Sequence, residues 1–219
     1  MINLEISLAK LKSILCLNGE IPNREFFLRH ADLPIIAADG ASNTLISMGF
    51  IPKLIIGDLD SIDRSIIPPA TEIMHITDQD STDSEKSLLV MAQRELFPCL
   101  VYGATGKELD HTLHNLTIMA AYSKLQSIIF HDSVYKTQEK YGVFVTDKFT
   151  GQLKIGAKIS LLSLSSALIS SKGLKWELNQ MHLSAQHSSI RNEVKVTNIE
   201  ITVHSGTVLI LFDHSLFNS

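Results

Sequence analysis

The segment PIIAADGASNTLISMGFIPKLIIGD (residues 34–58) contains two short apolar runs on either side of a helix-like stretch. The runs PIIAAD (34–39) and KLIIGD (53–58) have the length and character of strands that are covered on both faces, as in a parallel sheet. The stretch ASNTLISMGF (41–50) between them ends near Gly49, a residue typical of helix C-termini. The segment therefore predicts a strand–helix–strand unit.

The same alternation extends over most of the first half of the chain. Four more apolar runs predict strands: SILCLN (13–18), EIMHIT (72–77), PCLVYG (98–103) and QSIIFHD (126–132). Three stretches between them predict helices: NREFFLRHA (23–31), STDSEKSLLVMAQREL (81–96) and ELDHTLHNLTIMAAYSK (108–124). Thr82 and Glu85 have capping-box spacing, so the second of these helices is expected to start at Thr82 or Ser81. Strand–helix alternation of this kind indicates an open α/β sheet.

From about residue 134 the pattern changes to β-branched, partly alternating runs with glycines at expected turns. These runs are VYKTQEKYGVFVTD (134–147), GQLKIGAKISLLSL (151–164), KVTNIEITVHSG (195–206) and TVLILF (207–212). No long amphipathic helix is evident there. The predicted fold is an α/β N-terminal domain with a mainly parallel open sheet, residues 1–133, followed by a small antiparallel β-sandwich domain, residues 134–219.

Composition narrows the class of protein. The chain has 219 residues, a net charge of −4 and 45% hydrophobic residues, which describes an ordinary globular protein without the basic face of nucleic-acid binders. The run ISLLSLSSALISS (159–171) is too short and too polar for a membrane span, and the charged N-terminus does not resemble a signal peptide. Cys16 and Cys99 lack metal-site spacing and are expected to be reduced core thiols, which favours a cytoplasmic location.

Polar or glycine-containing groups follow the predicted strands. They are Asn18-Gly19, Asp39-Gly40, Gly57-Asp58, Asp78 with Asp80, and Gly103. Because ligands bind beyond the carboxyl ends of strands in open α/β sheets, these groups are expected to meet at one edge. Functional chemistry is predicted at that edge.

Six of the chain's twelve aspartates fall between residues 58 and 83. Asp58 and Asp60 form a D-x-D pair after one strand, and Asp80 and Asp83 surround the start of the next helix. Clustered carboxylates repel one another unless a cation lies among them, and hard oxygen ligands of this kind select Mg²⁺ with phosphate. The alternative interpretation is Asx-turns and a helix cap on solvated loops.

Two neighbouring features fit a phosphate site. Lys86 follows Asp83 by three residues, so both can project from one helix face and offer charge to a phosphoryl group. The stretch GATGKELDH (103–111) has glycines whose backbone N–H groups could bind an anion, although it is neither a P-loop nor G-x-G-x-x-G. His111 and His114 lie three apart, but the acidic set favours a hard cation over a histidine-bound metal.

Taken in order, six stretches resemble the thiamine pyrophosphokinase (thiamine diphosphokinase) family. They are LNGEIP (17–22), AADGASN (37–43), IIGDLDSI (55–62), DQDSTDSEKSL (78–88), GATGKELDHTLHN (103–115) and GLKWEL (173–178). They cover both halves of the chain, and the pattern DxD…DxDxTDxxK is the most specific of them. The resemblance implies transfer of pyrophosphate from ATP to the hydroxyl of thiamine, giving thiamine diphosphate and AMP.

The resemblance also implies roles for individual residues, a partner and a cofactor. Mg²⁺ and the phosphates would be held by Asp58, Asp60, Asp80 and Asp83, with Lys86 as the neutralising catalytic cation. Positioning of ATP or thiamine would fall to Asp39, Asn43, Thr82, Asp110 and His111. Thiamine would be held by Trp176, Ser189 and Asn192. The family works as a homodimer with its sites at the subunit interface, and its β domain helps to hold thiamine.

The chain departs from the family pattern at three places. Ala41 replaces a second glycine, and Ser189-Ile190-Arg191-Asn192 replaces a Thr-Ser-Asn ending. Glu108 stands where the family has an arginine before its Asp-His pair, and Lys107 is expected to supply that cation. Two alternatives therefore stay open: an Mg-dependent pyrophosphotransferase with another alcohol acceptor, and a non-catalytic thiamine- or nucleotide-binding regulator.

Overall fold

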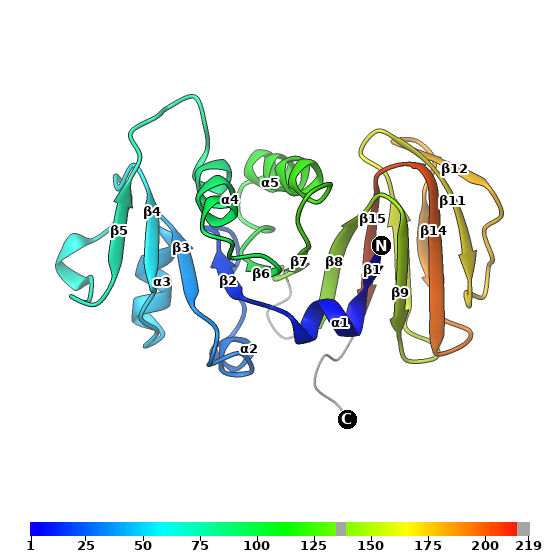
Figure 1. The fold of residues 1–219 in the computed structure, drawn as a ribbon, viewed down its shortest axis with the longest axis horizontal. Coiled ribbons are helices and arrows are strands. Elements are labelled where there is room, and N and C mark those ends of the chain that lie inside the picture. Colours follow the sequence, from blue (N-terminus) through cyan, green and yellow to red (C-terminus); the bar gives the residue numbers. More distant parts are fainter. Residues whose placement is uncertain (135–138, 214–219) are drawn as a thin grey trace. The chain divides into compact units, whose positions relative to one another are not determined.

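The computed structural model describes residues 1–134 and 139–213, which form two compact units (Figure 1). The α/β unit comprises Leu11–Ile118 and the segment that begins at Phe130. The β unit comprises Met1–Lys10, Met119–Ile129 and the described residues from 139 onward. The domain limits predicted from the sequence, 1–133 and 134–219, stay a prediction.

Five parallel strands form the sheet of the α/β unit. In spatial order they are β6 (Cys99–Tyr102), β2 (Ser13–Cys16), β3 (Ile35–Ala38), β4 (Leu54–Gly57) and β5 (Glu72–His75). All residues of β2, β4 and β6 are buried, which accounts for their unbroken apolar sequences. The strands predicted from the sequence and their parallel pairing are confirmed.

The helices of this unit lie between the strands along the chain. They are α2 (Arg24–Leu28), α3 (Ala41–Ser47), the 3₁₀ turn η1 (Arg64–Ile66), α4 (Asp83–Gln93) and α5 (Leu109–Tyr122), which continues past Ile118 into the β unit. Thr82 caps α4 and forms a capping box with Glu85, as predicted. Gly49 follows the end of α3 with φ of 83°, the left-handed conformation expected of a helix stop.

The edge strand β5 differs from its neighbours because its side chains are mostly exposed. Arg94, at the end of α4, donates two hydrogen bonds to the Glu72 carboxylate of β5, at 2.6 and 2.8 Å. This bidentate pair joins the edge strand to a helix whose start carries part of the functional site.

The β unit consists of two sheets. One has the order β1 (Ile2–Asn3), β9 (Lys148–Gln152), β14 (Asn198–Gly206), β11 (Ser166–Lys172), β12 (Met181–Ser184). The other includes β13 (Ser189–Glu193), β10 (Lys158–Leu162), β15 (Val208–Asp213), β8 (Lys140–Val145). Phe149 of the first and Phe212 of the second are in ring contact, with centroids 5.8 Å apart. The antiparallel β-rich second half predicted from the sequence is confirmed; β7 (Ile128–His131) lies where the chain passes between the units.

The first ten residues belong to the β unit, an assignment that the sequence analysis did not make. β1 pairs in parallel with β9, and α1 (Leu4–Ala9) follows at once. Leu4 is fully buried and packs on Gly151, where an added Cβ would lie 3.1 Å from the Leu4 Cβ. Glycine at this position therefore makes room for the helix.

Cys16 and Cys99 are both buried and unpaired, on the neighbouring strands β2 and β6. Burial raises the pKa of each thiol, so both stay protonated, as the sequence analysis expected of core thiols. No helix in the described part of the chain is both long and apolar enough to cross a membrane.

Replacing Leu4 by alanine is expected to lower the free energy of unfolding by about 2–5 kcal/mol, because it removes a fully buried side chain. Chemical denaturation measures the change. Ile6→Ala is the matched control, because Ile6 lies on the same helix with its side chain half exposed, and should cost much less. Equal losses for both variants would mean that α1 does not dock through Leu4.

Candidate active site

A cavity of about 440 Å³ lies in the α/β unit at the carboxyl ends of its parallel strands. Its walls come from the loops that follow β2, β3, β4 and β6 and from the starts of α4 and α5. This is the position that the sheet topology favours for a ligand. Five of the residues predicted from the sequence line it: Asp39, Thr82, Asp83, Asp110 and His111.

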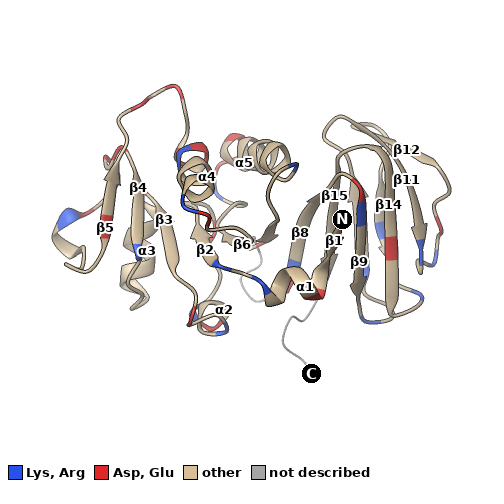
Figure 2. Ribbon diagram, viewed as in Figure 1, with Lys and Arg blue, Asp and Glu red and all other residues tan. Residues whose placement is uncertain are grey.

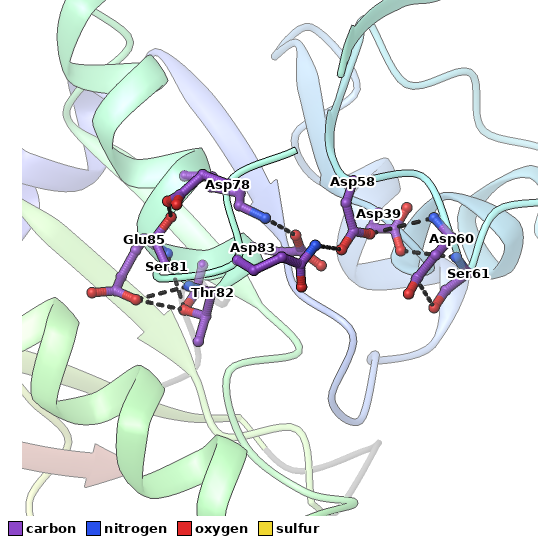
Figure 3. Close-up of polar contacts among 12 residues, drawn as sticks. Asp39, Asp58, Asp60, Ser61, Asp78, Ser81, Thr82, Asp83 and Glu85 are labelled. Carbon is purple, nitrogen blue, oxygen red and sulfur yellow. Dashed lines mark hydrogen bonds and ion pairs between the residues drawn. The ribbon is translucent and has the colours of Figure 1, made fainter. Parts of the chain in front are cut away.

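Three carboxylates meet beside this cavity. Asp39 follows β3, while Asp58 and Asp60 follow the adjacent strand β4, and one oxygen of each lies within 4.8 Å of the others (Figure 3). Asp39 is 3% exposed; its Oδ2 accepts a hydrogen bond from the Ser61 backbone N–H at 3.2 Å. Its Oδ1 is buried and has no hydrogen-bond partner among the described residues. An unpaired buried oxygen within a carboxylate cluster fits a divalent cation with oxygen ligands.

The electrostatics of the three carboxylates differ. Burial raises the pKa of Asp39, and the charges of Asp58 and Asp60 raise it further. Asp58 is solvated, and the hydrogen bond that it accepts from Gln79 Nε2 at 3.1 Å lowers its pKa. A bound cation would therefore stabilise mainly the ionised form of Asp39, which burial and the neighbouring charges disfavour.

The backbone around the cluster adopts conformations that favour small or polar residues. Asp39 has φ of 34° and Leu59, between the two aspartates of the D-x-D pair, has φ of 65°. A Cβ at Gly57 would lie 2.7 Å from the Asp39 Cβ and 3.2 Å from Asp83 Oδ1. Glycine at the end of β4 is therefore required for Asp39 and Asp83 to approach each other.

Asp83 and Lys86 extend the site along α4. The Lys86 ammonium lies 3.6 Å from Asp83 Oδ1 and is 4% exposed, so its charge is paired with this carboxylate. Burial raises the pKa of Asp83, and the charge of Asp39 adds to the effect. Asp83 lines the cavity, whereas Lys86 is not among the residues that line it.

The metal set predicted from the sequence is only partly brought together. Asp58 and Asp60 share the three-carboxylate cluster with Asp39, while Asp80 and Asp83 lie outside it. The loop between β5 and α4 carries acidic residues (Figure 2). Asp80 belongs to this loop, and its backbone N–H donates to Asp78 Oδ1 at 3.1 Å. The family resemblance implies that Asp39 positions ATP or thiamine; the sequence signal that it belongs with the D-x-D pair is its place directly after the neighbouring strand.

Asn43 does not line the cavity. Its Nδ2 donates to the Ser61 carbonyl at 2.8 Å, and its Oδ1 accepts from the Asp63 N–H at 3.1 Å. Both contacts hold the loop that carries Asp60. In this structure Asn43 therefore supports the carboxylate loop, while its predicted role in positioning a ligand stays a prediction.

The wall at the start of α5 includes Lys107, two residues before the helix. Lys107 Nζ donates to Asn18 Oδ1 at 3.1 Å, and both residues line the cavity with Glu108. His114, from the next turn, lies 3.2 Å from Thr82 Oγ1 and 3.2 Å from Glu85 Oε2 through its Nε2. The histidine therefore joins the capping box of α4, a contact that the sequence analysis did not predict.

The residues predicted to hold thiamine gather in the β unit. Trp176 is 56% exposed, which separates it from a core tryptophan. Asn192 is buried; its Nδ2 donates to the Trp176 carbonyl at 2.7 Å and its Oδ1 accepts from the Trp176 N–H at 3.3 Å. Ser189 Oγ lies 3.4 Å from the same Nδ2. The three residues form one cluster that presents an indole ring to solvent.

Comparison with known proteins finds a matching family model for each of the two parts of the chain. The family model described as "Thiamin pyrophosphokinase, catalytic domain" matches residues 27–130, and the one described as "Thiamin pyrophosphokinase, vitamin B1 binding domain" matches residues 148–208. The chain belongs to the thiamin pyrophosphokinase family. The three carboxylates and the cavity lie within or beside the catalytic match, and the Trp176 cluster lies within the vitamin B1 binding match.

Relatives in the thiamin pyrophosphokinase family extend over nearly the whole chain. A thiamin pyrophosphokinase of Caenorhabditis elegans is 28% identical over 88% of this chain and 85% of its own length. One from Arabidopsis thaliana is 23% identical over 84% of this chain and 81% of its own length. The solved thiamin pyrophosphokinase of Candida albicans shares the fold with a TM-score of 0.79 at 16% identity, covering 98% of this chain and 92% of that chain.

Replacing Asp39 by asparagine is expected to raise the free energy of unfolding of the metal-free protein at pH 7. The folded-state pKa of Asp39 lies above its unfolded value of about 3.9, so the folded protein holds this proton more tightly. The free energy of unfolding contributed by Asp39 therefore falls as pH rises above that value, and the variant loses this dependence.

Urea denaturation at several pH values, with and without Mg²⁺, measures the effect. Mg²⁺ should stabilise the wild type more than the variant, because a ligand that binds the folded state raises its stability. Asp63→Asn is the control, because Asp63 caps η1 and lies outside the cluster. A less stable Asp39→Asn protein at pH 7 would contradict the assignment.

Proposed function

We propose that this chain transfers a pyrophosphoryl group from ATP to the hydroxyl of thiamine, giving thiamine diphosphate and AMP. The observation that carries the proposal is the presence on one chain of a thiamin pyrophosphokinase catalytic match and a vitamin B1 binding match. The named relatives, each covered over more than four fifths of its length, support the same reaction.

The α/β unit is proposed to bind Mg–ATP in its cavity. Asp39, Asp58 and Asp60 would hold Mg²⁺, and Asp80 would act from the loop beside them. When bound, Mg²⁺ supplies positive charge to the phosphate oxygens of ATP. The unpaired Oδ1 of Asp39 supports this placement.

The transfer needs alignment and charge neutralisation more than covalent catalysis. A primary alcohol must approach the β-phosphorus in line with the bond to the leaving AMP. Lys86 places a positive charge 3.6 Å from Asp83, a residue that lines the cavity. Asp83 is a suitable acceptor for the hydroxyl proton, because it lines the cavity and its pKa is raised by burial. Thr82, Asp110 and His111 are proposed to position the substrates.

The β unit is proposed to bind thiamine through the Trp176 cluster. An exposed indole offers a flat surface for an aromatic ring and a favourable one for a cationic ring. Asn192 holds the main chain of Trp176 in place, and the Ser189 hydroxyl accepts a hydrogen bond from the Asn192 side chain.

A homodimer with sites at the subunit interface is proposed for the assembly. Leu109 and Leu113 of α5 are 71% and 54% exposed, beside cavity-lining residues of the same helix. Neighbouring exposed leucines at a ligand site support a partner surface there. The buried, protonated thiols of Cys16 and Cys99 support a cytoplasmic location.

A pyrophosphotransferase with another alcohol acceptor is the second candidate. Glu108 favours it, because this additional carboxylate lines the cavity. Competition between thiamine and other alcohols in the same assay separates the two activities.

Purified protein with thiamine, ATP and Mg²⁺ is expected to form thiamine diphosphate and AMP in equal amounts, followed together by mass spectrometry. Asp60→Asn should lower kcat by about 100-fold or more, since it removes a charge from the proposed metal cluster. Asp63→Asn is the matched control and should keep wild-type activity. Thiamine monophosphate with ADP would contradict pyrophosphoryl transfer, and absence of any product with bound substrates would favour a regulator.

Leu113→Glu is expected to convert a dimer to a monomer, because it places a charge on an exposed apolar position of α5. Light scattering after size-exclusion chromatography measures the mass. Ile51→Glu is the control, since Ile51 is exposed before β4, at the opposite end of the strands from the cavity. A wild-type monomer, or a Leu113→Glu dimer, would contradict the proposed interface.

A further inference from the structure

The indole ring of Trp176 already has a cation on one face. Lys175 Nζ lies 4.9 Å from the ring centroid. We propose that Lys175 is a specificity-determining residue: it restricts ligand stacking to the opposite face of Trp176 and weakens the binding of cationic rings relative to neutral rings of the same shape. The inference rests on the proposed function, because it takes Trp176 as part of the thiamine surface.

Lys175 is held over the ring by contacts from the main chain and from a carboxylate. Its backbone N–H donates to the Glu193 carbonyl at 2.8 Å, and its Nζ lies 3.4 Å from Glu193 Oε1. Lys158 binds the other oxygen, Oε2, at 2.7 Å. The hydrogen bond from Lys158, with the charges of both lysines, lowers the pKa of Glu193, which therefore stays ionised as an anchor.

The main chain of Trp176 is held by Asn192. Asn192, next to Glu193 on β13, binds both the N–H and the carbonyl of Trp176. Two pairs of contacts therefore join residues 175–176 to residues 192–193. The contacts of Asn192 hold the main chain of Trp176, and those of Glu193 hold Lys175 over the indole ring. Exposed Lys–Trp neighbours without such anchoring would sample many arrangements.

The placement has a calculable electrostatic consequence. A ligand ring stacked on the face of the indole opposite Lys175 would lie on the order of 8 Å from the Lys175 ammonium, from the observed separation and a normal stacking distance. In a solvated setting, repulsion between two unit charges at that range changes affinity by about 2- to 5-fold. A cationic thiazolium experiences this repulsion, and a neutral ring of equal size does not.

The sequence supplies a reporter for this site, because Trp176 is the chain's single tryptophan. Quenching of its fluorescence follows ligand binding to the full-length protein without requiring turnover. The probes are thiamine and 3-deazathiamine, in which a neutral thiophene replaces the thiazolium. The ratio of their dissociation constants isolates the effect of charge, since both ligands need the same ring surface.

Lys175→Met is expected to tighten thiamine relative to 3-deazathiamine by about 2- to 5-fold. Lys175→Arg should keep the wild-type ratio, because it keeps the cation over the ring. Lys195→Met is the matched control, an exposed lysine of the same unit without a contact to the indole among the described residues. Salt should reduce the difference between Lys175→Met and wild type, because screening weakens repulsion.

An unchanged ratio in Lys175→Met, or an equal shift in Lys195→Met, would overturn the inference. Thiamine diphosphate formation without any quenching of Trp176 would also overturn it, while the proposed function would stand. Charge-dependent quenching by thiamine in a protein that forms no thiamine diphosphate would have the reverse meaning: the inference would stand and the proposed reaction would fail.

Discussion

Parallel pairing of β3 with β4 is the constraint on which the site depends. The two strands run in the same direction, so Asp39 and Asp58 leave the sheet at the same edge and on neighbouring strands. Their charges repel, and burial of Asp39 makes this repulsion more costly. The fold can hold them together because the buried apolar strands beneath leave little freedom to separate.

Several energetically unfavourable features of the structure thus fall together on one residue of the site, Asp39. Asp39 has a buried oxygen without a partner among the described residues, a positive φ and acidic neighbours. Gly57 allows the approach, and the backbone N–H of Ser61 partly offsets the charge. Strained or unpaired groups of this kind are common where a protein is pre-organised for a ligand, because the bound ligand then provides the interaction that the free protein lacks.

Sequence reasoning reached the architecture because local signals and global fold agree. Unbroken apolar runs became buried parallel strands, and Thr82 with Glu85 became an observed capping box. The sequence placed Asp39 and Asp58 at the same edge of the sheet but did not indicate Asp39 as a metal ligand, because pairing of strands decides which loops become direct neighbours. Nor could spacing show that His114 reaches Glu85, or that Trp176 is exposed. Those facts depend on tertiary packing, which no local pattern records.

The N-terminal segment has a consequence for the order in which the protein is made. Ile2 pairs with Phe149 and Asn3 with Thr150, so the first strand has no partner until the ribosome has synthesised most of the chain. The strands of the α/β unit, β2 to β6, are all complete by then. Since units generally fold in order of synthesis, the α/β unit is free to form while residues 1–10, which belong to the β unit, still lack their partner strand. Pairing of β1 with β9 therefore comes after synthesis of all the parallel strands from β2 to β6.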